Sequence, residues 1–349
     1  MTQRTLPTAA RRFGAALLFL AAGGLFMGGL GRSALAEGPE AAPEAPAAEM
    51  PEALGDLEKL ENALKSKKSI NDEIIQYVDL VGGHFRAIKG PEPAADDAPQ
   101  EAKDEYAAAK KKFDKDFADY RKKAEKAIFK ALGLVKLRGE TNERNEVNMK
   151  AAQVIGSLAA AFPGGLIPIK DDEDAEKLRK ANVGEREDLA KKLMKEIDSL
   201  HKAKYDLSSD VLQAAFGALG QLNTLNSVEW MLADYSHAKN NEVMWLVAAH
   251  KALPSFGPVP GHLRYDLVEQ FIRTYVGVES AANTSSTDPK DQAKKRFWDD
   301  IRTFTVPVVQ YYAGNPVDAE TNEALSTMGQ FDEWFRDHKN KRKAPWTDE

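Results

Sequence analysis

The chain has 349 residues, of which 43% are hydrophobic; it contains no cysteine and carries a formal net charge of −6. This acidic balance argues against general nucleic-acid binding, which needs a basic footprint. The lack of cysteine excludes disulfides, thiolate metal sites and a cysteine nucleophile, so stability must come from burial of apolar side chains.

The N-terminus has the pattern of an export signal. Basic residues precede an apolar run at 13–30, and Ala34-Leu35-Ala36 gives the small-x-small pattern that signal peptidases cleave. We expect a signal peptide at 1–36 and a periplasmic or secreted protein; the alternative is a membrane helix, since about 18 apolar residues span a bilayer. Arg11-Arg12 leaves Sec and twin-arginine export both open. Cleavage removes four arginines and no acid, which takes the net charge to −10.

Two segments read as linkers. Residues 37–56 are dominated by Ala, Pro and Glu and predict a disordered tether, because such a segment has little apolar surface to bury. A similar loop at 90–100 divides an N-terminal helical region, which we place at 57–137.

A long amphipathic helix is predicted between residues 101 and 137. Apolar residues recur there at gaps of three, four or seven, which is one face of a helix: Tyr106, Phe113, Phe117, Tyr120, Ala124, Ile128 and Leu132. We expect this helix to dock on a helical body rather than to form a coiled coil.

The remainder also reads as helical, so the predicted fold class is all-α. The stretch at 301–312 comes closest to a strand pattern. Pro307 argues against a central strand there, and the spacing of its apolar residues favours a helix that is kinked or broken near the proline.

A repeat is visible in three of the predicted helices. They end in Val-Ile-Gly-Ser-Leu (154–158), Ala-Leu-Gly-Gln-Leu (218–222) and Ala-Leu-Pro-Ser-Phe (252–256). Each ending follows a pair of alanines, and each helix opens with an acidic-Val step. The alanines would let neighbouring helices approach closely, and Gly or Pro would stop the helix.

The helices that follow also match, residues 228–235 with 268–275. The hairpin units 209–235 and 241–275 resemble bacterial HEAT repeats, with a weaker likeness at 146–200. Leu212 and Met244 replace the arginine usual after the opening Val. The resemblance implies an α-solenoid of HEAT-like hairpins, which we place at 138–338, followed by a basic and polar tail at 339–349.

Catalytic motifs are present only as fragments. Ser199-Leu200-His201-Lys202 fits S-x-x-K without the companion motifs of a serine acyl-transfer site. Residues 171–174 are acidic, and we expect them to favour a helix N-terminus rather than bind calcium. The histidines lack metal-ligand spacing. We therefore predict no enzyme activity, cofactor or metal.

Partner binding is the remaining prediction, because solenoids bind through their surfaces. Aromatic residues of adjacent units are candidate anchors, although large core residues are an alternative reading: Trp230, Tyr235, Trp245, His262 and Tyr265. The basic tail, with Lys339, Lys341, Arg342 and Lys343, is a candidate membrane contact; the alternative is a solvated helix end that complements its own dipole. We expect an exported scaffold for a protein partner in the bacterial cell envelope. The alternative is an accessory subunit or enzyme whose site lies between the N-terminal helices and the solenoid.

Overall fold

The computed structural model describes residues 50–66, 69–88, 90–95, 97–134, 144–202, 207–235, 243–283 and 285–347; the side chains of Asp234 and Tyr235 are excepted. The chain divides into a unit at 1–42 and a unit at 43–349, and the described residues all belong to the second. The predicted signal peptide and most of the predicted 37–56 linker therefore lie outside the described residues.

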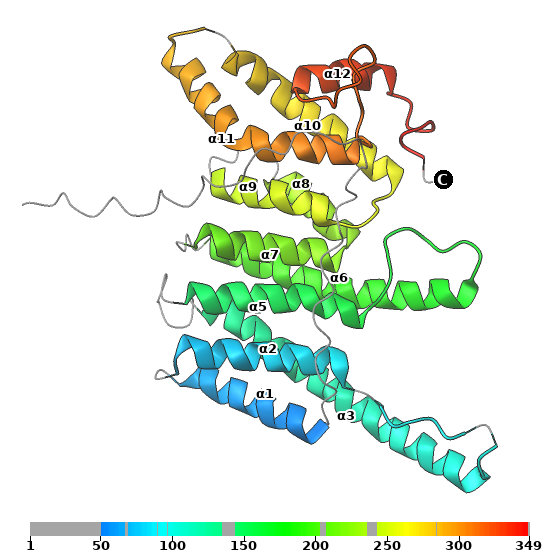
Figure 1. Cartoon of the computed structure of the whole chain (residues 1–349). Helices are drawn as coiled ribbons and strands as arrows, with labels where there is room; N and C mark the ends of the chain where they lie inside the picture. Colours follow the sequence, from blue (N-terminus) through cyan, green and yellow to red (C-terminus); the bar gives the residue numbers. More distant parts are fainter. Residues whose placement is uncertain are drawn as a thin grey trace, which may run out of the picture. The chain divides into compact units, whose positions relative to one another are not determined.

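The described part of the chain is built from α-helices, and its β-type pairing is one isolated bridge between Val317 and Ala324 (Figure 1). The helices are α1 (Met50–Lys65), α2 (Asn71–Ala87), α3 (Gln100–Leu132), α5 (Asn145–Ser157), α6 (Glu173–Lys202), α7 (Ser209–Leu222), α8 (Leu225–Tyr235), α9 (Val243–Ala252), α10 (Gly261–Ala282), α11 (Pro289–Tyr312) and α12 (Met328–Asp337). Short 3-10 turns extend α5 and α9: η1 (Leu158–Ala161) and η2 (Leu253–Ser255).

The helices pack as stacked hairpins. One layer consists of α2, α5, α7, α9 and α11, each in contact with the next. On these helices pack α1 and α3 at one end, α6 in the middle and α10 at the other end. The predicted fold class, an all-α arrangement stacked in the manner of a solenoid, is confirmed.

The three predicted repeat helices are α5, α7 and α9, and they follow one another directly in this layer. Glycines of α5 and α7 explain the close stacking. A Cβ atom at Gly156 would lie 2.8 Å from the Ala218 Cα atom, and one at Gly220 would lie 3.3 Å from the Ala252 carbonyl oxygen. The same position of two successive repeats thus lacks a side chain because the next helix occupies that space.

The glycines do not stop the helices, which corrects one detail of the sequence interpretation. Gly220 lies inside α7, which runs on to Leu222. Asn223 ends the helix in the left-handed conformation, with a φ of 51°, and its N–H donates to the Leu219 carbonyl. Asparagine tolerates this conformation better than most residues with a side chain, so it takes the role that a C-terminal glycine often has.

A buried histidine joins α9 to α10 and α11. The Thr305 hydroxyl donates to the Ile301 carbonyl and therefore accepts from Nδ1 of His250 at 2.9 Å. The Tyr275 hydroxyl lies 3.4 Å from Nε2 of the same ring. His250 is fully buried, and burial lowers its pKa to about 3, so the ring is neutral at physiological pH.

The long helix predicted at 101–137 is α3, which ends at Leu132. Its C-terminal half buries the predicted apolar face, including Tyr120, Ala124 and Ile128, whereas most side chains of its N-terminal half are exposed. The N-terminal half of α6 is also largely exposed, and both halves extend past the ends of neighbouring helices (Figure 1).

Two boundaries differ from the expectation. Helix α1 begins at Met50, so residues 50–56 are helical rather than part of the linker; Ala53 and Leu57 bury their side chains on its inner face. The predicted polar tail folds back on the protein, because Trp346 is only 2% exposed and its ring N–H donates to the His338 carbonyl at 2.7 Å. Helix α11 continues through Pro307, so the predicted helix is confirmed and the alternative of a break near the proline is wrong.

Candidate functional site

Two of the predicted aromatic anchors meet inside the stack. The rings of Trp230 and Trp245 lie 6.0 and 6.2 Å from the ring of Phe216, measured between centroids. Trp245 is 6% exposed and also contacts His201, with the ring centroids 4.4 Å apart. Trp245 is thus a core residue, which was the alternative interpretation, and Trp230 is partly buried against the core.

The other predicted anchors lie elsewhere. Tyr265 is 6% exposed and packs between Phe335 and Trp346, with Lys341 over its ring at 4.4 Å. His262 is exposed on the first turn of α10, and the side chain of Tyr235 is outside the described part. Trp230 and Trp245 therefore belong to one cluster and Tyr265 to another, and Trp245 and Tyr265 offer little surface to a partner.

The structure instead shows a cavity of about 430 Å³ between α3 and α6. Its apolar lining comes from four segments that are distant in the sequence: Phe85 at the end of α2, Phe117 on α3, Phe162 after η1 and Leu189 on α6. A volume of this size lies at the lower end of the range for ligand pockets.

Arg121 is the polar centre of this cavity. Its guanidinium carbon lies 4.4 Å from the ring centroid of Phe117 and 5.0 Å from those of Phe85 and Phe162. Cation–π contact with three rings fixes the plane of the guanidinium group. Its Nε atom is sealed from solvent and has no hydrogen-bond partner in the described structure. Burial lowers the pKa of Arg121, but arginine starts so far above neutral pH that it stays charged.

A hydrogen bond from Tyr120 fixes the position of α3 along α2. The Tyr120 side chain is fully buried, and its hydroxyl donates to the Val81 carbonyl at 3.0 Å. Nearby, the buried His84 ring lies 3.0 Å from the Asp56 carboxylate and ties α2 to α1. These bonds hold α1, α2 and α3 together, and the Arg121 guanidinium of α3 lies 5.0 Å from the Phe85 ring of α2.

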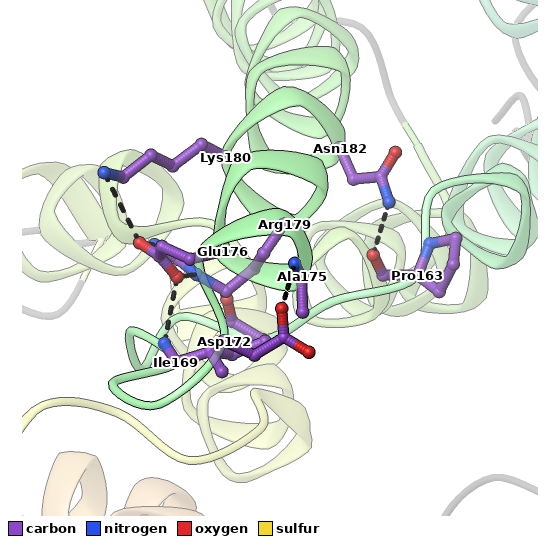
Figure 2. A network of polar contacts seen from close by, with 9 residues as sticks. Pro163, Ile169, Asp172, Ala175, Glu176, Arg179, Lys180 and Asn182 are labelled. Carbon is purple, nitrogen blue, oxygen red and sulfur yellow. Dashed lines mark hydrogen bonds and ion pairs between the residues drawn. The ribbon is translucent and has the colours of Figure 1, made fainter.

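A network of polar contacts holds Phe162 in place by pinning the loop before α6 (Figure 2). Glu176 binds Arg179 at 2.6 Å and accepts the Ile169 N–H at 2.9 Å, and these bonds lower the pKa of Glu176 to about 2. Asn182 donates to the Pro163 carbonyl at 2.6 Å. Arg186, outside this network, donates through Nε to the carbonyl of Phe162 itself, also at 2.6 Å.

The acidic segment at 171–174 has the structural role that the sequence indicated. Helix α6 begins at Glu173, and Asp172 accepts the N–H of Ala175 at 2.9 Å (Figure 2). A carboxylate at this position binds an unpaired N–H group and interacts favourably with the helix dipole.

The charged residues around the cavity are mostly compensated by one another. Four carboxylates line it, and three of them have a cation within 4.0 Å: Glu125 with Lys192 at 2.5 Å, Asp114 with Lys110 at 2.8 Å and Asp188 with Lys191 at 3.9 Å. Among the described residues, Arg121, Lys122 and Glu185 form no such pair. The lining itself holds three cations and four carboxylates, a sum of −1; when Lys110 and Lys191, which lie outside the lining, are counted with their partners, the balance is about +1, on a protein that is acidic as a whole.

Sequence reasoning missed this cavity. The local signal was the spacing of Phe117 and Arg121, which are four residues apart and so share one face of a helix. The rings of Phe85 and Phe162 come from other segments, which are close to Arg121 only because the hairpins stack. The repeat pattern was too weak at residues 146–200 to predict that stacking.

Within the described residues, no group of three or more His, Asp or Glu side chains could hold a metal ion. Over the same residues, no helix is long and apolar enough to cross a membrane. Comparison with known proteins gave no matching family model, curated protein or solved structure.

Proposed function

We propose that the protein is an exported, non-catalytic scaffold of HEAT-like helical repeats that binds a protein partner in the bacterial cell envelope. The observation that carries the proposal is the Arg121 cavity between α3 and α6. Arginine and aromatic side chains in desolvated pockets contribute most of the free energy of protein–protein binding. Stacked helical hairpins commonly present such surfaces to a partner.

The flanking helices support a macromolecular partner. Residues 101–119 of α3 and 173–188 of α6 are mostly exposed and carry charges of both signs. A partner seated over the cavity would meet these charged residues as a polar rim around an aromatic centre, which is the usual anatomy of an interface.

The envelope location rests on the export signal at 1–36, and the HEAT relationship rests on the repeat motifs. The tail remains a proposed membrane contact through Lys339, Arg342 and Lys343, whose side chains are exposed. Lys341 has a competing role, because it forms an ion pair with Asp266.

Photo-crosslinking in the cell tests the scaffold proposal. A benzophenone amino acid replaces Ala118, an exposed residue that lines the cavity; as the control it replaces Leu54, which is 44% exposed on α1. We expect one stoichiometric adduct from position 118 and none from position 54. No adduct at either position, or the same adducts at both, contradicts partner binding at this cavity.

The alternative, an enzyme or accessory subunit, would use the same cavity, since it lies between the N-terminal helices and the rest of the stack. Its described lining holds no serine or histidine, and three of its four carboxylates are ion-paired. Paired carboxylates are poorly suited to proton transfer at neutral pH. We therefore favour binding over catalysis as the role of this site.

A further inference from the structure

We propose that the Arg121 cavity binds a carboxylate group presented by the partner protein, either an acidic side chain or a C-terminus, and that this carboxylate is the anchor of the interface. The inference rests on the proposed function for the nature of the occupant. It goes beyond that function by naming the chemical group that enters the site.

The geometry of Arg121 favours a planar anion. Three phenylalanine rings hold the guanidinium group, and its Nε atom faces the protein interior without a partner. The remaining N–H donors lie at the end of the side chain, where two of them can bind the two oxygens of one carboxylate in parallel. Because the rings already restrict the side chain, little conformational entropy is lost when the anion binds.

The charge balance favours a monoanion over a phosphate. Asp114 and Asp188 pair with Lys110 and Lys191 outside the lining, and Glu125 pairs with Lys192, so Arg121 and Lys122 remain against the carboxylate of Glu185, with a balance of about +1. One carboxylate neutralises this charge, whereas a phosphomonoester carries about −1.5 to −2 and exceeds it. The apolar rings favour a carboxylate flanked by aromatic or aliphatic groups.

The test follows the Arg121 Nε–H resonance in the full chain labelled with ¹⁵N. This proton is sealed from solvent, so its exchange with water is slow enough to observe. The probes are synthetic Gly-flanked peptides with an acetylated N-terminus: Phe-Glu-Phe as the amide, Phe-Gln-Phe as the amide, and Phe-Gln-Phe with a free C-terminal carboxylate. A fourth peptide, also an amide, carries phosphoserine in place of Glu.

We expect a saturable shift with at least one carboxylate peptide, and at least tenfold weaker binding of the Gln amide. The Glu amide reports a side-chain carboxylate, and the free C-terminus reports a terminal one. If no carboxylate peptide differs from the Gln amide, or if the phosphoserine peptide binds more tightly than both carboxylate peptides, the proposal is wrong.

Two variants locate the site. Arg121→Met keeps an unbranched apolar side chain against the rings but removes the donors, and Lys123→Met removes an exposed cation from the same helix outside the cavity. Followed on the Ala118 amide, peptide binding should weaken at least tenfold in R121M and stay unchanged in K123M. Equal binding by R121M and the wild type overturns the assignment.

The two proposals fail separately. Peptide binding at Arg121 without a crosslinked partner at position 118 leaves the carboxylate site intact and contradicts the scaffold function. A crosslinked partner without any carboxylate-dependent shift supports the scaffold function and contradicts the carboxylate site.

Discussion

The close contact of repeats at Gly156 predicts that a single methyl group destabilises the stack. A Cβ atom there would lie 2.8 Å from the Ala218 Cα atom and 3.1 Å from its Cβ atom, so the backbone of α7 would have to move. Overpacking of this kind costs about 1–3 kcal/mol. Replacing glycine inside a helix by alanine returns about 1 kcal/mol of helix propensity. Because a backbone atom is involved, we expect the upper part of the range and a net loss of about 1–2 kcal/mol for Gly156→Ala.

The matched control lies on the partner helix. A Cβ atom at Gly217 of α7 would meet nothing within 4 Å, so Gly217→Ala should stabilise the protein by up to about 1 kcal/mol through helix propensity alone. Urea unfolding followed by far-UV circular dichroism measures both variants against the wild type. If Gly156→Ala is as stable as the wild type, glycine-mediated contact between the repeats is not needed for stacking.

Three further predictions concern pH and the C-terminus. Because its folded pKa of about 2 lies below the usual value of 4.5, Glu176 stabilises the folded loop fully above pH 4.5 and loses this effect as the pH falls toward 2; the protection of the Ile169 N–H against hydrogen exchange, relative to its intrinsic rate at each pH, should fall over that window in the wild type but not in Glu176→Gln. Burial holds His250 neutral down to a pKa of about 3, so the unfolded state binds the extra proton and stability should fall from about pH 6.5 toward 3; urea midpoints of His250→Gln should depend less on pH in that range. Trp346→Ala should cost about 3–5 kcal/mol, because the ring is buried among aromatic residues; an unchanged urea midpoint would show that the tail does not contribute to the core.

The sequence was sufficient to predict the helices and the order of the repeats. Helical periodicity located α3, since its apolar face is long and regular, and the recurring Ala-Leu-Gly-x-Leu pattern located α7 and its neighbours. Both signals are local, because they depend on residues within one or two turns of each other.

The candidate site was not predictable by the same reasoning. Phe85, Arg121 and Phe162 are distant in the sequence, and they meet because α2 packs on both α3 and η1, and because Arg186 of α6 binds the carbonyl of Phe162. The aromatic residues selected from the sequence are ordinary core residues in the case of Trp245 and Tyr265, because a large apolar side chain has the same pattern in a core and in a binding site. Trp346 could not be placed either, since a basic tail gives no sign of the aromatic cluster onto which it folds.

The most direct test of the account is the affinity of the crosslinked partner for three forms of the full chain: wild type, Arg121→Met and Lys123→Met. Isothermal titration calorimetry measures the dissociation constants, after urea unfolding has shown that all three forms are folded. Loss of a charged, hydrogen-bonded anchor costs about 1.5–3 kcal/mol, which corresponds to a loss in affinity of about tenfold or more. We expect that loss for Arg121→Met and unchanged affinity for Lys123→Met. Equal affinities for all three forms would contradict it.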